Sequence, residues 1–305
     1  MASLRSASVV AGSKSPRNIG QMAPPIISRP VSPDAMRFQF GKNWTRFLSL
    51  LDDERIAEAE RSLREMLGID DLRERSFLDV GSGSGLFSLA AKRLGARRVL
   101  SFDYDRESVA CTCELKRRFY PDDASWTVDA GSVLDSDYLR SLGTFDIVYS
   151  WGVLHHTGAL WTALDNVTDL VASDGTLFIA IYNDQGSASR RWRAIKRLYN
   201  RSPRLIRLGL VAVVGAYSAV RVGLGRLLRG GNPLRGTSWP TEKKKDRGMS
   251  LWYDLVDWVG GYPFEVAKPE EVFDFCRARG FTLRRLKTVG GGLANNQFVF
   301  SRIVE

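Results

Sequence analysis

The sequence is poor in cysteine and histidine. Its 305 residues include three cysteines and two histidines. The cysteines, Cys111, Cys113 and Cys276, do not have the spacing of a metal site, and they are too few for the disulfide framework of a small secreted domain. We therefore expect no bound metal, no disulfide scaffold and a reducing, cytoplasmic location.

Long apolar runs are also missing. In the apolar segment Leu205–Leu228, the longest uncharged run, Leu208–Val220, has thirteen residues, whereas a membrane-spanning helix needs roughly twenty. Residues 1–35 contain no apolar segment of the secretory type either. Within them, Met1–Pro33 is rich in Ser, Pro and Arg and lacks acids, which is typical of a flexible tail. An organelle transit peptide is the alternative.

Acidic residues are scarce in one long segment. The chain carries a net charge of +10, and Arg190–Arg247 holds sixteen basic residues against two acidic ones. The remainder of the chain is therefore slightly acidic. The basic character belongs to this one segment and not to the predicted sheet.

Strands and helices alternate from Ser76 onward, after a helix predicted over Asp52–Leu67. This alternation predicts a parallel sheet with helices on both faces. The predicted strands are Ser76–Val80, Arg98–Phe102, Ser125–Asp129, Phe145–Ser150 and Thr176–Ile181, with Phe281–Thr288 and Gln297–Arg302 near the C-terminus. The predicted helices are Leu86–Leu94, Arg106–Phe119, Asp137–Leu142, Trp161–Val171 and Pro269–Arg279, with a turn at Ser173–Gly175.

The most informative motif is a glycine turn after the first predicted strand. The strand carries Asp79 near its end, and Gly81, Gly83 and Gly85 follow at alternate positions. Glycine permits backbone angles and close approaches that a side chain would prevent. Open α/β sheets bind nucleotide-like ligands at such a turn. The second strand ends at Asp103, where a carboxylate can accept both ribose hydroxyls of an adenosine.

The spacing of the glycines limits the class of ligand that the turn can bind. It is Gly-x-Gly-x-Gly and not the dinucleotide pattern, and no phosphate-binding loop with Gly-Lys-Ser/Thr occurs. With Asp103-Tyr104, the loop Gly131–Asp135 and the strand Phe145–Ser150, the chain resembles the class I S-adenosylmethionine (SAM)-dependent methyltransferases. The region of the fourth predicted strand, Phe145–Ser150, is similar to the quinone-biosynthesis and natural-product branch. The resemblance covers Ser76–Asn183 well and the C-terminal strands loosely.

The resemblance implies a fold, a cofactor and binding residues. The fold is a Rossmann-like seven-stranded methyltransferase sheet, mostly parallel with an antiparallel C-terminal strand. SAM is the implied cofactor, with Asp103 at the ribose, Tyr104 on the adenine and Asp79 beside the methionine end. The full set of implied cofactor residues is Asp79, Gly81, Gly83, Gly85, Asp103, Tyr104, Ser132, Val133 and Ser150. Ser132 departs from the family pattern, because many members have Asp there.

Three residues are candidates for the chemistry of transfer. His155 and His156 directly follow the fourth predicted strand, and Tyr182 follows the fifth. Carboxyl ends of such strands face the reaction crevice, and imidazole can remove a proton near neutral pH. We expect His156, and less so His155, to act as general base or substrate positioner, and Tyr182 to orient the substrate. For the histidines the alternative is hydrogen bonding to the following helix or to the cofactor loop, and for Tyr182 it is simple packing of the ring.

The chain divides into five predicted parts. They are a tail (1–35), a helical cap (36–75), the SAM-binding core (76–182), a basic and apolar insertion (183–268) and the end of the sheet (269–305). The insertion begins with a basic helix, Arg190–Tyr199. Its apolar part, Leu205–Leu228, is either a buried helix pair or a lid or amphipathic helix that meets a membrane or greasy substrate.

Aromatic segments flank these parts. Trp252–Phe264 is predicted to form a substrate-side wall, with Asp254 or Asp257 available to a polar group; a structural bridge is the alternative. Phe38–Trp44 is predicted to pack or to cap the cofactor. Lys243–Lys245 is predicted to be a solvated loop.

These features together favour a methyltransferase acting on a small or lipid-linked metabolite, by O-methylation. One alternative is an RNA methyltransferase that uses the basic insertion. The chain lacks an Asn-Pro-Pro-Tyr-like motif after the fourth strand, so a nucleic-acid partner is not favoured. The other alternative is a non-catalytic SAM-fold protein at a membrane surface. The sequence leaves the oligomeric state open and allows peripheral membrane contact through 205–228.

Overall fold

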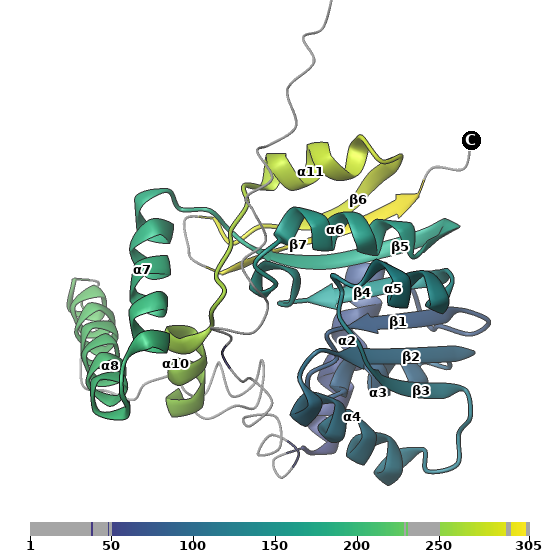
Figure 1. The fold of residues 1–305 in the computed structure, drawn as a ribbon, viewed down its shortest axis with the longest axis horizontal. Helices are drawn as coiled ribbons and strands as arrows, with labels where there is room; N and C mark the ends of the chain where they lie inside the picture. The colour runs from purple at the N-terminus through teal and green to yellow at the C-terminus, as the bar shows by residue number, and fades with distance from the viewer. Residues whose placement is uncertain are drawn as a thin grey trace, which may run out of the picture.

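A seven-stranded sheet forms the centre of the molecule (Figure 1). The structure is a computed structural model that describes residues 38, 48, 51–228, 230, 251–290 and 294–302. The strand order is β3-β2-β1-β4-β5-β7-β6, and β7 runs antiparallel to both of its neighbours while the other pairs are parallel. This confirms the predicted fold class. The strands are β1 (Ser76–Val80), β2 (Arg98–Asp103), β3 (Trp126–Ala130), β4 (Phe145–Trp151), β5 (Val171–Tyr182), β6 (Phe281–Lys287) and β7 (Asn295–Arg302).

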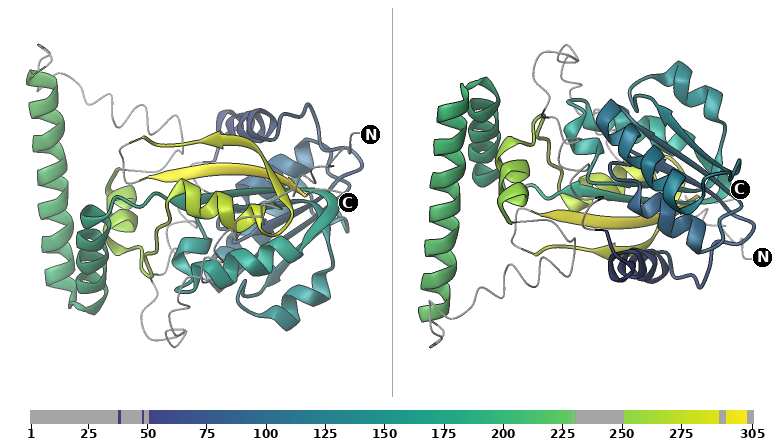
Figure 2. Two further views of the ribbon diagram at one scale, coloured as in Figure 1. Left: turned by 90° about the horizontal axis from the view of Figure 1, so that it is seen from above. Right: turned by 90° about the horizontal axis from the view of Figure 1, so that it is seen from below.

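Helices cover both faces of the sheet, as the two views of Figure 2 show. Residues alternate sides along a strand, so on β1 Phe77 packs toward one helical layer while Leu78 and Val80 pack toward the other. The first layer is α2 (Asp53–Leu67), α3 (Leu86–Arg93) and α4 (Arg106–Phe119). The second layer is α5 (Ser136–Leu142), α6 (Leu160–Asp169) and α11 (Pro269–Arg277).

The largest difference from the predicted elements lies between α6 and β5. The sequence predicted a helix through Val171 and a separate turn at Ser173–Gly175. That prediction was wrong, because α6 ends at Asp169 and β5 begins at Val171. Val171 pairs with Phe145 of β4, and the next pair joins Thr176 to Ile147. The early start of β5 therefore depends on the pair Val171–Phe145, and the turn-forming residues Ser173–Gly175 lie in the irregularity between these two pairs. The other boundaries differ by at most three residues.

The chain reverses its direction across the sheet between β1 and β4. From β1 it proceeds to β2 and β3 on one side, and then returns to β4 and β5 on the other. In open α/β sheets, ligands bind at such a switch point, outside the carboxyl ends of the strands. A short 3₁₀ helix, η1 (Leu154–His156), follows β4 at this edge.

The insertion forms a helical cluster beyond that edge. It consists of α7 (Ser187–Arg201), α8 (Arg204–Leu227) and α10 (Leu251–Gly260), and α8 is the outermost element in both views of Figure 2. The cluster has its own apolar core, formed by Tyr199, Val211, Val214 and Val259 with neighbours that include Trp192 and Trp258.

The structure corrects one interpretation of the apolar part. Leu205–Leu228 is not a buried helix pair, because α8 is one continuous helix and many of its apolar side chains are exposed. Among the described helices, none combines the length and the apolar content needed to cross a bilayer.

Several predictions concern residues that the structure does not describe. They include the tail and Lys243–Lys245, the side chains of Trp252–Asp254 and Asp257, and most of the Phe38–Trp44 cluster. Phe38 itself lies on the insertion: its backbone N–H donates to the carbonyl of Tyr262 at 3.0 Å, and its ring packs near Tyr199.

The last glycine of the turn offers a test of how tightly the site is built. Both Gly85 and Gly280 have positive φ (79° and 78°), but a Cβ on Gly85 would lie 2.8 Å from Cγ2 of Thr112, whereas Gly280 has open space. We expect Gly280→Ala to cost about 1–2 kcal/mol of stability from φ alone. We expect Gly85→Ala to cost roughly 1–3 kcal/mol more from the overlap. Urea unfolding of both variants measures this, and equal losses would contradict the packing argument.

Candidate functional site

The glycine turn is shaped by its protein neighbours. Gly81, Gly83 and Gly85 have φ values of 78°, 56° and 79°, in the left-handed region that favours glycine. A Cβ on Gly81 would lie 2.5 Å from the Cγ atoms of Val153, in the turn after β4. Space at Gly81 is thus limited by Val153 after β4, and space at Gly85 by Thr112 of α4, in addition to any ligand.

Asp103 is held at this turn by two backbone hydrogen bonds. Gly83 N–H donates to Oδ2 at 2.9 Å, and Asp105 N–H donates to Oδ1 at 2.8 Å. Burial raises the pKa of Asp103 to about 6, and these two hydrogen bonds oppose the rise. Each carboxylate oxygen has two lone pairs, so both oxygens can accept a further hydrogen bond from a ligand. The side chain is partly exposed.

Asp79 belongs to a buried hydrogen-bond chain that crosses three strands. Ser88 of α3 donates to Asp79 Oδ2 at 2.5 Å and lies 2.7 Å from the hydroxyl of Ser101 on β2. The Ser101 hydroxyl also accepts from the indole of Trp126 on β3 at 2.9 Å. Burial raises the pKa of Asp79 to about 7 against the Ser88 hydrogen bond. The hydrogen bonds therefore connect Asp79 of β1 to α3, β2 and β3 inside the protein.

The loop after β3 contributes a backbone contact to the same region. Gly131 N–H donates to the carbonyl of Asp103 at 3.1 Å. Next in the loop, the Ser132 hydroxyl accepts from Leu134 N–H at 3.2 Å, and the Val133 side chain is buried in the core. The loop thus offers a ligand its backbone and the partly exposed Ser132, but little of the Val133 side chain.

The other two predicted cofactor residues differ in access. Tyr104 follows Asp103 and is 47% exposed, so its ring is available to a ligand. Ser150, near the end of β4, is fully buried, and its hydroxyl donates to the carbonyl of Val80 at 3.1 Å. Ser150 thereby fastens the ends of β1 and β4 together.

The two histidines differ in environment. His155 is fully buried, and its Nδ1 accepts from Tyr182 N–H at 3.3 Å. Burial, followed by the charges of His156 and Lys196, lowers the pKa of His155 well below its ordinary value, so this ring stays neutral. His156 is only partly buried, and its Nδ1 lies 2.6 Å from the carbonyl of Pro263. Because a carbonyl only accepts, Nδ1 carries the proton and the neutral ring keeps a lone pair on Nε2.

Tyr182 brings the three candidate catalytic residues together. Its ring centre lies 3.9 Å from that of His155 and 5.5 Å from that of His156. The rings of Phe264 and Trp258, from the segment predicted as a substrate wall, lie 5.3 Å and 5.8 Å away. This arrangement places that segment against the ends of β4 and β5.

The sequence reasoning missed two residues of the site. Ser88 lies within the apolar stretch of α3, where a lone serine gave no signal of its link to Asp79. Lys196 is fully buried on α7, donates to the carbonyl of Trp258, and has its ammonium 4.5 Å and 4.9 Å from the ring centres of Trp258 and Phe264. The sequence does contain a signal for Lys196, because it lies on the same helix face as Trp192 and Tyr199. The many basic residues of this segment made one further lysine inconspicuous.

Val153 connects the glycine turn to the histidines. Its side chain occupies the space that a Cβ on Gly81 would need, and its carbonyl accepts from His156 N–H at 2.8 Å. A fixed carboxylate beside a glycine turn, with an accessible tyrosine next to it, fits the adenosine part of SAM. Among the described residues, no group of three or more His, Cys, Asp and Glu could hold a metal ion.

Comparisons with known proteins agree with this geometry. The sequence profile of a family described as "Methyltransferase domain" matches residues 51–208. Ribosomal protein L11 methyltransferase of Thermotoga maritima is 41% identical over 75 residues, which cover 24% of this chain and 25% of that protein. The match therefore spans only a quarter of that relative's length.

A solved structure shares the fold. The crystal structure of magnesium protoporphyrin IX methyltransferase from Synechocystis PCC 6803 with bound SAH matches with a TM-score of 0.50 and 13% identity. The match covers 86% of this chain and 95% of that one. At this identity the likeness concerns the fold alone. Because the family profile covers just over half of the chain, the protein belongs to the methyltransferase-domain family and is a class I SAM-dependent methyltransferase.

Proposed function

We propose that the protein transfers a methyl group from SAM to an oxygen of a small or lipid-linked metabolite. One observation carries this proposal: Val153 joins the glycine turn and its fixed Asp103 carboxylate to His156. The glycine turn and the candidate base His156 are thereby both held by Val153, at the switch point of the sheet. Binding and proton removal then occur at one edge.

The residues on the cofactor side have distinct roles. Asp103 accepts the ribose hydroxyls, Tyr104 packs on the adenine, and the backbone of Ser132 and Val133 frames its edge. Asp79 keeps the turn in place near the methionine end through Ser88. SAM supplies an activated methyl group on a sulfonium, so the main task of the chain is to align acceptor and donor.

The residues on the acceptor side remove the proton of the acceptor hydroxyl and orient the acceptor. Pro263 holds His156 in the tautomer with the proton on Nδ1, and Nε2 is then the basic nitrogen that takes the proton of an acceptor hydroxyl. Tyr182 orients the acceptor through its phenol. His155, neutral and enclosed, supports the Tyr182 ring and backbone.

The surface of α8 favours an acceptor that is reached at a lipid surface. Val213, Tyr217 and Val220 are 67%, 63% and 68% exposed, although each is apolar or aromatic. Further exposed residues on the same helix are Leu205, Leu224 and Leu227. Neither α7 nor α8 contains an acid; Arg204 begins α8, and Arg221 lies between the exposed Val220 and Leu224. Exposed apolar residues flanked by arginine are typical of helices that lie on anionic membranes.

The first prediction concerns Asp103. Hydrogen bonds to charged groups contribute about 1.5–3 kcal/mol each, so we expect Asp103→Asn to weaken S-adenosylhomocysteine binding at least tenfold in isothermal titration calorimetry. Asp71→Asn, exposed in the loop before β1, is the matched control and should bind normally. An unchanged affinity in Asp103→Asn would refute the ribose assignment, and absence of binding to the folded wild type would refute the proposed cofactor role.

The second prediction concerns His156. We expect His156→Gln to lower the rate of methyl transfer roughly 10²–10⁴-fold, as loss of a general base does, while S-adenosylhomocysteine still binds. Mass spectrometry of a host-cell extract incubated with labelled SAM, with and without the protein, detects the product and supplies the assay. A rate within about threefold of wild type would remove His156 from the mechanism.

The third prediction concerns α8. Burying each exposed Val or Tyr contributes about 1–3 kcal/mol, so the triple variant Val213→Ser/Tyr217→Ser/Val220→Ser should lose more than 90% of its flotation with phosphatidylglycerol vesicles. Together the three substitutions remove about 3 kcal/mol or more, which weakens partitioning at least about a hundredfold. Phe119→Ser/Leu286→Ser, which alters exposed apolar residues of the sheet body, should float as wild type does. Wild-type protein that stays with the unbound fraction, or equal flotation of the triple variant, would contradict membrane contact.

A further inference from the structure

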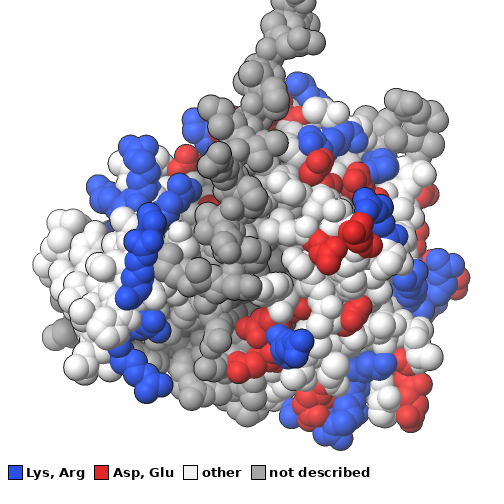
Figure 3. Space-filling model, viewed as in Figure 1, with Lys and Arg blue, Asp and Glu red and all other residues white. Residues whose placement is uncertain are grey.

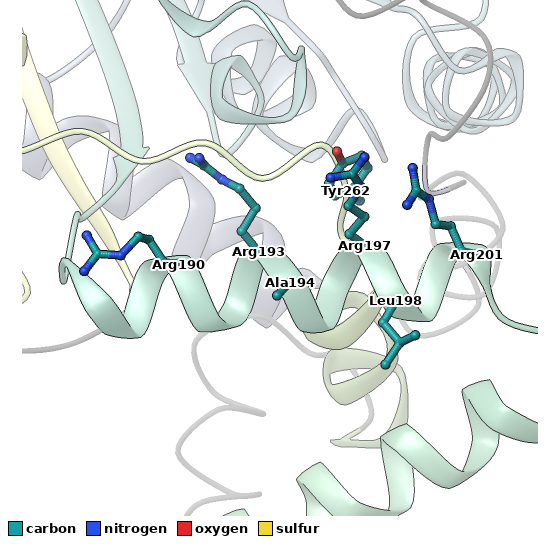
Figure 4. A pocket seen from close by; sticks show the side chains of 7 residues that line it. All are labelled: Arg190, Arg193, Ala194, Arg197, Leu198, Arg201 and Tyr262. Atoms are coloured by element: carbon teal, nitrogen blue, oxygen red, sulfur yellow. The ribbon is translucent and has the colours of Figure 1, made fainter.

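A row of arginines on α7 lines a cavity of about 390 Å³ (Figure 4). Arg190, Arg193, Arg197 and Arg201 extend from one side of the helix, and Tyr262 closes the cavity beside Arg197. With a rise of 1.5 Å per residue, the row is roughly 16 Å long. In Figure 3 it appears as a continuous basic ridge over α7.

The arginines of this row differ from those elsewhere in their pairing. On α2 and α4, Arg61, Arg64, Arg117 and Arg118 each form an ion pair with a glutamate three or four residues away. Arg190, Arg197 and Arg201 form no ion pair with any acid in the described part of the chain, and no acid lines the cavity. Like charges three and four residues apart destabilise a helix, so this row is costly unless an anion binds it.

Arg193 has a separate, structural contact. Its Nε donates to the carbonyl of Phe264 at 3.0 Å, and its charge lowers the pKa of Glu265 against a larger rise from burial. Arg193 therefore fastens the segment after α10 onto α7. The other three guanidinium groups remain available to a ligand.

The cavity adjoins the acceptor side of the catalytic site. Tyr262 lines the cavity, and the next residue, Pro263, accepts the hydrogen bond from His156. Phe264 then contacts Tyr182 through its ring and Arg193 through its carbonyl. The three consecutive residues Tyr262, Pro263 and Phe264 thus connect the arginine row with the candidate base, His156.

We propose that this cavity binds a phosphate or diphosphate group of the methyl acceptor, a proposal that rests on the function proposed above. A guanidinium donates two parallel hydrogen bonds to phosphate oxygens and stays charged at all working pH values. Adjacent arginines along the row can each take one phosphoryl group. The small cavity suits a short anionic group that is joined to the reacting part of the acceptor, and not a long nucleic-acid strand.

Calorimetric titration of the full chain with inorganic pyrophosphate at low ionic strength tests the site. We expect Arg197→Ala/Arg201→Ala to bind at least tenfold more weakly than wild type. The control Arg191→Ala/Arg204→Ala removes two exposed arginines outside the cavity and should bind within about twofold of wild type. Equal weakening in both double variants would show diffuse attraction to the basic surface and overturn the site, and so would unchanged binding in the first.

Two further ligands identify the source of the phosphate. Where pyrophosphate binding is weakened in Arg197→Ala/Arg201→Ala, an accompanying loss of phosphatidylglycerol vesicle binding in that variant and not in the control would assign a lipid headgroup, while unchanged vesicle binding would assign a soluble acceptor; both support the site. Tighter binding of a single-stranded RNA oligonucleotide than of pyrophosphate, lost in the same variant, would overturn the small-group assignment. S-adenosylhomocysteine binding is titrated separately, so failure of the methyltransferase proposal remains distinguishable from failure of this one.

Discussion

The close approach of two turns, one after β1 and one after β4, is the constraint on which the site depends. Gly81 must lack a side chain because Val153 occupies that space, and Val153 in turn holds the backbone of His156. The Ser150 hydroxyl joins the ends of the same two strands by its hydrogen bond to the carbonyl of Val80, the residue before Gly81. Cofactor turn and candidate base are therefore positioned by one packed contact, and a shift in either turn moves the other.

Two carboxylates near this contact are held in different ways. Asp79 is enclosed, with its hydrogen-bond partner supplied by α3, and its pKa is raised to about 7 by burial and, in smaller part, by the charge of Asp103. Asp103 keeps partial access to solvent and has two backbone donors. Since a cation favours the ionised form of a nearby carboxylate, binding of a sulfonium ligand would offset part of the cost of keeping these two charges together. The turn is thus electrostatically suited to a positively charged donor.

The sequence predicted what local chemistry determines. Positive φ at Gly81, Gly83 and Gly85, an acid at the end of β2 and the alternation of strands with helices all follow from residues close together in the chain. The start of β5 could not be predicted in this way, because it depends on the pairing of Val171 with Phe145, a residue of the neighbouring strand, before the irregularity that contains Ser173–Gly175. The cavity on α7 depends on Tyr262, more than sixty residues from Arg201, and the exposure of α8 depends on which of its faces meets α7 and α10. Such tertiary contacts join residues far apart in the chain, so they cannot be predicted from the local sequence pattern.

The insertion presents two chemically different surfaces that do not compete. On α7, Trp192 and Tyr199 face the apolar core shared with α8 and α10, whereas Arg190, Arg197 and Arg201 lie on the opposite side of the helix. On α8, Val211 and Val214 face that same core, and Val213, Tyr217 and Val220 face outward. The arginine row therefore points away from the exposed apolar face, so a membrane covering α8 would leave the cavity open toward the catalytic edge. One helical cluster can in this way contact a lipid surface with its outer helix and hold the anionic end of an acceptor with its inner one.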